Sequence, residues 1–157
     1  MPIRLVTVGK VSAPWSAVCT EYAARLQRYD RLEIVEVPEF KEPQHTSETA
    51  LKEHTRREGE GLLKRIRADE YVIALCIDGK QHGSEFFSNR LRALRVEGKS
   101  PCFVIGGSMG LSEEVLQRAD ERMSLSAMTF PHQMARAVLL EQLYRAFKIM
   151  GGERYHK

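Results

Sequence analysis

Residues 123–149 read MSLSAMTFPHQMARAVLLEQLYRAFKI, and they are the most informative part of the chain. It predicts a short strand, a tight polar loop and a long helix that starts with Pro131 at its first position, where a missing N–H matters least. At about 100° per residue, the apolar residues of this helix fall on two sides: Met134, Ala135, Val138 and Leu139 on one, and Leu143, Phe147 and Met150 on the other. We therefore expect its own sheet to cover one side and a further element, such as a second subunit, the other.

Outward from this stretch, strand and helix patterns alternate along the whole chain. Strands are expected at 3–8, 32–37, 71–77 and 102–105, and helices at 15–27, 47–67 and 84–97 and from Ser112. The long polar helix should lie on the outside, and the turn Asp78-Gly79 should stop the third strand. The alternation predicts a single α/β domain with an open, mostly parallel sheet, in which ligands bind beyond the carboxyl ends of the strands.

Composition indicates one globular domain over all 157 residues, since 43% are hydrophobic and 29% are charged. No stretch approaches the roughly 18 apolar residues of a membrane span, and the first residues lack a signal-peptide pattern, so we expect a cytoplasmic protein without a membrane partner. The cysteines are odd in number and lack metal-binding spacing such as C-x-x-C. We expect free, mostly buried thiols and no metal site: Cys19, Cys76 and Cys102.

Basic residues gather in three segments although the net charge is only +3. Each segment could be ordinary solvated surface, but three in one small domain favour a polyanionic partner such as RNA. The segments are 52–67 (Lys52, Arg56, Arg57, Lys64, Arg65 and Arg67), 90–99 (Arg90, Arg92, Arg95 and Lys99) and the tail (Arg154, His156 and Lys157).

Three loops follow successive strands and could hold a small ligand: 75–79, 105–110 and 125–130. Glycines let backbone amides and carbonyls approach a ligand closely, and Gly106, Gly107 and Gly110 together favour such contact. Gly79 alone is better explained by a simple turn. The pattern G-G-x-x-G is not the dinucleotide fingerprint G-x-G-x-x-G, and no G-x-x-x-x-G-K-[ST] occurs, so both nucleotide interpretations are weak.

Four motifs together resemble one family. Phe103-Val-Ile-Gly-Gly-Ser-x-Gly110, Ser124-Leu-Ser-x-Met-Thr-Phe-Pro-His132, Leu140-Glu-Gln-Leu-Tyr-Arg-Ala-Phe-Lys-Ile149 and the terminal Tyr155-His156-Lys157 are similar to the RlmH family. The likeness runs from the first strand to the last residue. Members of the RlmH family are small SPOUT-class methyltransferases that act on N3 of a pseudouridine in 23S ribosomal RNA of the large subunit.

The resemblance implies a fold, a cofactor and an assembly. The fold would be a single-domain parallel-sheet SPOUT fold whose carboxyl-terminal part, about 72–157, is threaded as a deep trefoil knot. The protein would be a homodimer packed through this region, acting on ribosomal RNA in the assembled ribosome. The cofactor would be S-adenosylmethionine, bound at positions carried over from the family: Leu75, Gly106, Leu125, Ser126, Ala127, Met128, Thr129 and Phe130.

The acceptor nitrogen carries a proton that must leave, so a base or a cation should lie near it. The candidates are His132, Arg136, Glu141, Arg154, Tyr155 and His156. His132 could equally be a structural hydrogen-bonder, Glu141 is expected to pair with an arginine, and arginines do not act as bases. The match of the tail to the family motif favours His156 with Tyr155 as the group that orients and deprotonates the base, with Arg154 holding the uracil or its phosphate.

Two alternatives stay open at this point. The enzyme could act on another RNA, such as a tRNA, or the chain could be a non-enzymatic ribosome-binding protein that uses its basic helices alone.

Overall fold

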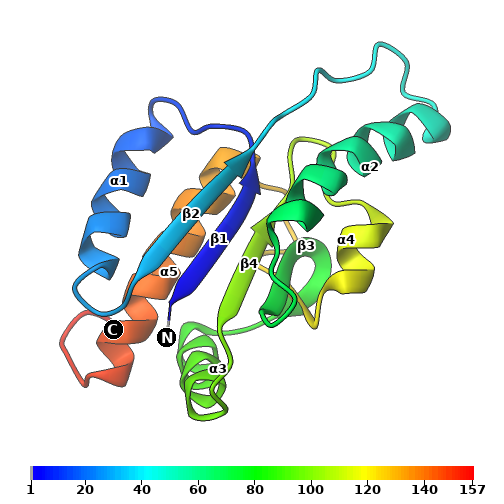
Figure 1. The fold of residues 1–157 in the computed structure, drawn as a ribbon. Helices are drawn as coiled ribbons and strands as arrows, with labels where there is room; N and C mark the ends of the chain where they lie inside the picture. Colours follow the sequence, from blue (N-terminus) through cyan, green and yellow to red (C-terminus); the bar gives the residue numbers. More distant parts are fainter. Residues whose placement is uncertain (1) are drawn as a thin grey trace.

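The computed structural model describes residues 2–157 and contains one parallel β-sheet (Figure 1). Every strand pair is parallel, and the strand order is β2-β1-β4-β3-β5. The expected α/β architecture is confirmed. The strands are β1 Ile3–Val8, β2 Leu32–Val37, β3 Tyr71–Gln81, β4 Pro101–Ile105 and β5 Glu121–Ser124.

Helices cover both faces of the sheet, which gives three layers. On one face α5 (His132–Met150) packs between α1 (Trp15–Leu26) and α3 (Ser84–Val96), and on the other lie α2 (Glu48–Arg65) and α4 (Glu113–Arg118) (Figure 1). Within residues 2–157, none of these helices is long and apolar enough to cross a bilayer.

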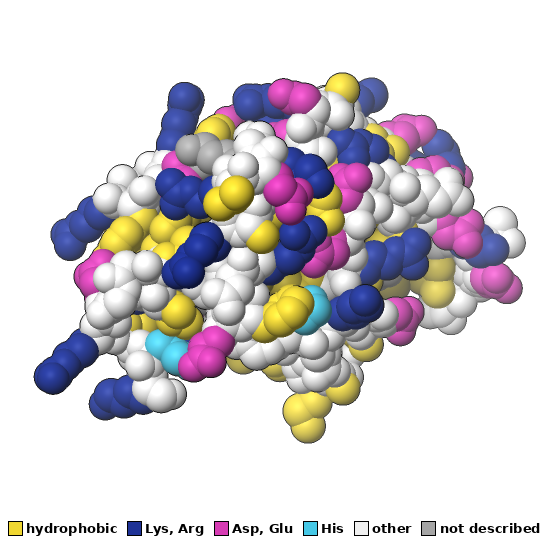
Figure 2. Space-filling model, turned by 90° about the horizontal axis from the view of Figure 1, so that it is seen from below, with side chains coloured by type: hydrophobic (Ala, Val, Ile, Leu, Met, Phe, Trp, Pro, Cys, Tyr) yellow, Lys and Arg dark blue, Asp and Glu magenta, His cyan; other side chains and the backbone are white. Residues whose placement is uncertain are grey.

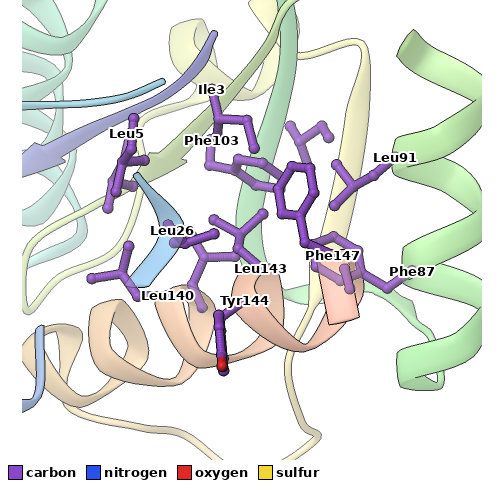
Figure 3. Packing of buried hydrophobic residues seen from close by; sticks show 14 of the residues in the cluster. Ile3, Leu5, Leu26, Phe87, Leu91, Phe103, Leu140, Leu143, Tyr144 and Phe147 are labelled. Carbon is purple, nitrogen blue, oxygen red and sulfur yellow. The ribbon is translucent and has the colours of Figure 1, made fainter. Parts of the chain in front are cut away.

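The larger core lies between the sheet and α5. Figure 3 shows Phe103 of β4 between side chains of α3 and α5, and the rings of Phe87 and Phe103 meet edge to face with centroids 6.0 Å apart. Leu139 and Leu143 of α5 are fully buried in the same cluster. The two leucines were predicted on different sides of the helix, and that detail is wrong because both face the sheet.

The helix α5 is covered within its own chain by more than the sheet. Its two flanks pack on α1 and α3, so the second covering expected from the sequence comes at least partly from these helices. Met134 and Val138 remain half-buried at the surface, and packing against a second subunit stays a prediction. The helix begins at His132, one residue later than predicted, because Pro131 has an extended ψ of 142° and acts as the N-cap.

The strand β3 does not stop at Asp78-Gly79 as predicted. Its pairing with β5 shifts register between Leu75 and Lys80 and then resumes, so the residues between them form an irregularity within the strand. A Cβ at Gly79 would lie 2.5 Å from the backbone carbon of Met123, which requires glycine for close approach of the two strands. The simple-turn interpretation of Gly79 is therefore wrong.

The helix α2 lies on the outside but buries polar residues that the sequence did not single out. The apolar residues in and next to this helix are Ala50, Leu51, Leu62, Leu63 and Ile66, of which only Leu62 is fully buried. The residues that face inward with it are His54, Glu58 and Gly59. A Cβ on Gly59 would lie 2.3 Å from Ser112 Oγ, so α2 approaches the start of α4 very closely.

A buried ion pair joins β1 to the residue that precedes β3. Arg4 Nη1 on β1 donates to both carboxylate oxygens of Glu70 at 2.7 and 2.8 Å, and both side chains are almost fully buried. We expect Glu70→Gln to lower the free energy of unfolding by about 3 kcal/mol, because it removes the buried carboxylate of this pair and leaves the Arg4 guanidinium only the partly exposed Glu33, whose Oε2 lies 3.4 Å from Arg4 Nε. Urea unfolding measures this. Glu53→Gln, which breaks the exposed pair with Arg56, is the matched control and should change little; equal effects would contradict the expectation.

Candidate functional site

The three segments predicted to hold a ligand meet in one cleft, which is formed by the irregular part of β3 and by the loops that follow β4 and β5. The cleft has a volume of about 890 Å³, which suits a small-molecule ligand. Its walls are residues 75–78, 105–111 and 124–132 except Ala127, together with Leu116 and Ala135.

Most of the predicted cofactor positions lie on these walls. Ala127 belongs to the third loop but is not part of the cleft wall. Cys76 also lines the cleft and is half-buried, whereas Cys19 and Cys102 are buried; all three thiols are free, as expected. The predicted positions that line the cleft are Leu75, Gly106, Leu125, Ser126, Met128, Thr129 and Phe130.

Glycine backbone forms one wall of the cleft. A Cβ on Gly106 would lie 2.5 Å from the carbonyl oxygen of Gly110, and one on Gly107 would lie 2.9 Å from Glu58 Oε1. Gly110 N donates to Gly107 O at 3.1 Å, and Gly110 has a φ of +84°, which side chains rarely adopt. The loop is a tight turn that presents bare backbone to the cleft.

The third loop is held in shape by its own serines. Ser124 Oγ donates to the carbonyl oxygen of Ser126 at 2.8 Å, and Met128 N donates to Ser126 Oγ at 3.0 Å. These bonds leave the Met128 side chain 76% exposed at the mouth of the cleft. A large apolar side chain is thus available there to cover a bound molecule.

His132 joins the cleft wall at the first turn of α5. Its Nε2 is buried, makes no hydrogen bond to any described residue and lies 3.8 Å from Glu39 Oε1. Buried polar atoms are normally satisfied, so this nitrogen is available to a ligand or water. The structure therefore places His132 at the ligand site, a role that its sequence pattern left open.

Behind the glycine wall lies a buried carboxylate that the sequence did not reveal. Glu58 Oε2 accepts a hydrogen bond from Phe40 N at 3.1 Å, and Oε1 lies 3.3 Å from His54 Nε2. Burial raises the pKa of the Glu58 carboxyl, against the lowering effects of the Phe40 amide and His54. The only sequence signal was a His and a Glu four residues apart, followed by Gly59, in a helix otherwise read as surface.

Arg136 has a structural role. Its Nη1 donates to Glu36 Oε2 at 2.8 Å and its Nη2 to the carbonyl oxygen of Gly9 at 2.9 Å, with only 2% of the residue exposed. The side chain ties α5 to the ends of β1 and β2. This agrees with the expectation that an arginine does not act as the base.

The tail folds back onto α5 and α1. Tyr155 Oη donates to Glu141 Oε1 at 3.1 Å and lies 3.4 Å from Tyr22 Oη, while Arg145 Nη1 lies 3.2 Å from His156 Nδ1. Burial and the bonds to Tyr22 and Glu141 raise the pKa of Tyr155.

Glu141 forms the arginine pair that was expected, with Arg145. The tail residue Arg154 is exposed.

The structure does not bring the tail to the cleft of its own chain. The cleft lies at His132, whereas the tail packs near Arg145, roughly 20 Å further along the helix at a rise of about 1.5 Å per residue. In Figure 1 the carboxyl terminus lies at the opposite end of α5 from the start of that helix. A site that uses both would need a second chain or a movement of the tail.

Several basic residues of the first two segments pair with neighbouring carboxylates. Figure 2 shows basic and acidic side chains interspersed on the face that it draws. Such paired charges attract a polyanion less than the sequence alone suggested. The pairs are Lys52–Glu48, Arg56–Glu53, Arg56–Glu60 and Arg67–Glu33 from the first segment, and Arg90–Glu121, Arg95–Asp30 and Lys99–Glu97 from the second.

Comparisons with known proteins agree with this architecture. The family model described as "Predicted SPOUT methyltransferase" matches residues 1–156. Proteins called ribosomal RNA large subunit methyltransferase H from Bacillus pumilus and Listeria monocytogenes are 48% and 49% identical, each aligned over the whole of both chains. A solved structure of a probable methyltransferase from Bordetella pertussis shares the fold at 18% identity, with a TM-score of 0.53 over 92% of this chain and 95% of that one.

Proposed function

Because this chain belongs to the SPOUT methyltransferase family, we propose that it transfers a methyl group from S-adenosylmethionine to large-subunit ribosomal RNA in the cytoplasm. The observation that carries the proposal is the meeting of three separate segments, the irregular part of β3 and the loops after β4 and β5, in one cleft. The acceptor we propose is N3 of a pseudouridine, presented in the assembled ribosome. The similar proteins named above carry the rRNA assignment in their names.

The residues of the cleft fit the proposed cofactor. The volume of about 890 Å³ accommodates a nucleoside with an amino-acid side arm. A Cβ at Gly106 or Gly107 would collide with its neighbours, so the wall is open backbone that can bond the polar edges of a ligand. Leu75, Leu125 and Phe130 supply apolar surface for a purine. When bound, S-adenosylmethionine supplies the methyl group as a sulfonium electrophile.

Calorimetry tests cofactor binding directly. We expect S-adenosylmethionine to bind with a stoichiometry of one per chain, and adenosine alone to bind more weakly because it lacks the amino-acid arm. The absence of binding heat at any temperature tested, with the protein folded, would contradict the proposal and favour a ribosome-binding protein without enzymatic activity.

We also propose that residues 72–157 form the trefoil knot of this class. Two features support this: the chain must pass β3 to run from β4 to the outer strand β5, and the loop after β5 lines the same cleft as the loop after β4. Such threading is rare in proteins.

The tail has the groups that the acceptor requires. His156 is a titratable imidazole next to the Arg145 guanidinium, Tyr155 is anchored on Glu141, and Arg154 is an exposed cation. We assign His156 with Tyr155 to orienting the pseudouridine and removing its N3 proton, and Arg154 to holding the uracil or its phosphate. The separation of tail and cleft along α5 supports a homodimer in which the tail of one subunit completes the cleft of the other.

Binding to ribosomal RNA should weaken with salt. We expect the logarithm of the association constant to fall linearly with the logarithm of salt concentration, by about 0.7 to 0.9 per phosphate contact. Filter binding between 50 and 200 mM salt, roughly the range over which this effect is large, measures the slope. Arg56→Gln is a control that should leave the slope unchanged, because Arg56 is already paired with Glu53. A flat salt dependence would contradict a phosphate-contacting role for the basic residues.

A further inference from the structure

Glu58 is an unusual residue for its position in the fold. It lies in the middle of α2, a largely polar helix, yet its side chain is only 2% exposed. Burying a carboxylate is unfavourable unless bonds or charges compensate it. One oxygen, Oε2, accepts from Phe40 N, but Oε1 makes no hydrogen bond to any described residue. The compensation within the chain is thus incomplete.

Only the backbone of one glycine separates this carboxylate from the cleft. Gly107 lines the cleft, and a Cβ added to it would lie 2.9 Å from Glu58 Oε1 and 3.3 Å from Oε2. Any other residue at 107 would push the carboxylate away. The field of Glu58 therefore reaches the cleft through a thin, water-poor wall, where electrostatic interactions are screened far less than at the surface.

The charged groups around Glu58 come from three elements. His54 is on α2 itself, Glu39 is on the connection after β2, and His132 is at the start of α5. Of these, only the two histidines can compensate the carboxylate, and only when they are protonated. When both histidines are neutral, the cluster carries a net negative charge behind the cleft.

A second carboxylate, Asp78, lines the cleft directly but is exposed. Solvent and salt screen its charge. Among the carboxylates described here, Glu58 is the one that combines burial with contact to the cleft wall.

We propose that Glu58 is a positioning residue whose negative charge makes the cleft prefer the cationic sulfonium of S-adenosylmethionine over the neutral thioether of S-adenosylhomocysteine. This rests on the proposed function. In the transfer, the methyl carbon bonds to the acceptor nitrogen, the electron pair of the S–C bond stays on sulfur and the N–H proton leaves. The two ligands share every other charge, so a fixed negative charge behind the wall acts mainly on the difference between them. It favours binding of the cofactor and release of the spent product.

Calorimetry with both ligands measures this preference. The ratio of the dissociation constants for S-adenosylhomocysteine and S-adenosylmethionine is measured at pH 8 for the wild type and for Glu58→Gln. A unit charge about 10 Å away at an effective dielectric constant of about 20 corresponds to roughly a tenfold change in an equilibrium constant. We expect the substitution to lower the ratio by about this factor. Glu60→Gln, two residues along α2 on the exposed side, should leave it unchanged.

The thermal stability of Glu58→Gln shows whether the substitution acts by removing a charge or by disturbing the fold. The folded-state pKa of Glu58 is raised, so the stability that this group contributes is present below its unfolded pKa and lost as the pH rises through the folded value. At pH 8 a neutral glutamine removes that penalty and can still accept the bond from Phe40 N. The melting temperature of ligand-free Glu58→Gln should therefore be equal to or above that of the wild type, although its preference for the cofactor falls.

A pH series on the wild type gives a readout without mutation. Protonation of Glu58, Glu39, His54 or His132 each makes the cluster less negative, so the preference should fall as the pH is lowered from 8 to 5. The ratio of the two dissociation constants should change less with pH in Glu58→Gln, because only three of these four groups remain. Equal losses of affinity for both ligands, or an unchanged ratio, would overturn the inference while leaving the proposed function intact. If the folded wild type binds neither ligand, the proposed function itself fails.

Discussion

Deleting residues 153–157 should lower the rate of methylation by about a hundredfold to ten-thousandfold, the range expected when a general base is removed, while the affinity for S-adenosylmethionine changes little. The tail carries the imidazole of His156 and the anchored phenol of Tyr155, and no tail residue lines the cleft. Cofactor binding and catalysis should therefore separate cleanly. Single-turnover methyl transfer and calorimetry on the same preparations measure the two effects.

The control for this truncation is removal of Lys157 alone, which keeps Tyr155, His156 and their contacts with Glu141 and Arg145. It should retain nearly full activity. Substantial methylation by the protein that lacks 153–157 would show that the base lies elsewhere, with His132 at the cleft as the next candidate.

The second large effect is expected at Gly106. In Gly106→Ala the new Cβ would lie 2.5 Å from the carbonyl oxygen of Gly110, so the backbone of the loop must move into the cleft or away from it. A displacement of about 1 Å in a positioned site changes rates or affinities by roughly a hundredfold. We expect a loss of this size in affinity for S-adenosylmethionine, measured by calorimetry.

Gly83→Ala is the matched control because a Cβ there meets no atom within 4 Å and the φ is −71°. It should bind the cofactor like the wild type. Unchanged affinity in Gly106→Ala would contradict the assignment of this loop to the cofactor site.

Gly106→Ala and the deletion of residues 153–157 together test whether the tail of one subunit acts in the cleft of the other. One mutant keeps its tail but has a defective cleft, and the other keeps its cleft but lacks the tail. If each subunit completes the cleft of its partner, an equal mixture refolded together should recover about a quarter of wild-type activity, since half of the dimers hold one intact site. Without recovery, the tail acts within its own chain after moving toward the cleft.

Local sequence patterns predicted most of the fold. The β-branched run of β1 and the helix α3, closed by Gly98 with a φ of +70°, lie where the pattern placed them. Their signals are local: period, caps and turn residues. The prediction failed at Gly79, where the need for glycine comes from the backbone of β5, some forty residues away in the chain.

The ligand loops were predictable because the carboxyl ends of parallel strands share one edge of the sheet. Two features of the site could not be predicted from the sequence. Glu58 reads as a surface residue until α2 is packed against Gly107, and the position of the tail depends on contacts with Tyr22 and Glu141 in other helices. Tertiary contacts of this kind have no local signature in a single sequence.

Methyl transfer to ribosomal RNA can be followed with S-adenosylmethionine labelled in its methyl group. The protein is incubated separately with isolated rRNA, large subunits, whole ribosomes and tRNA that lack the modification, and the labelled nucleoside is then mapped. We predict label on N3 of one pseudouridine of large-subunit RNA, most efficiently in assembled ribosomes. Label on a tRNA nucleoside, or no label on any RNA with a protein that binds the cofactor, would contradict methyl transfer to large-subunit RNA.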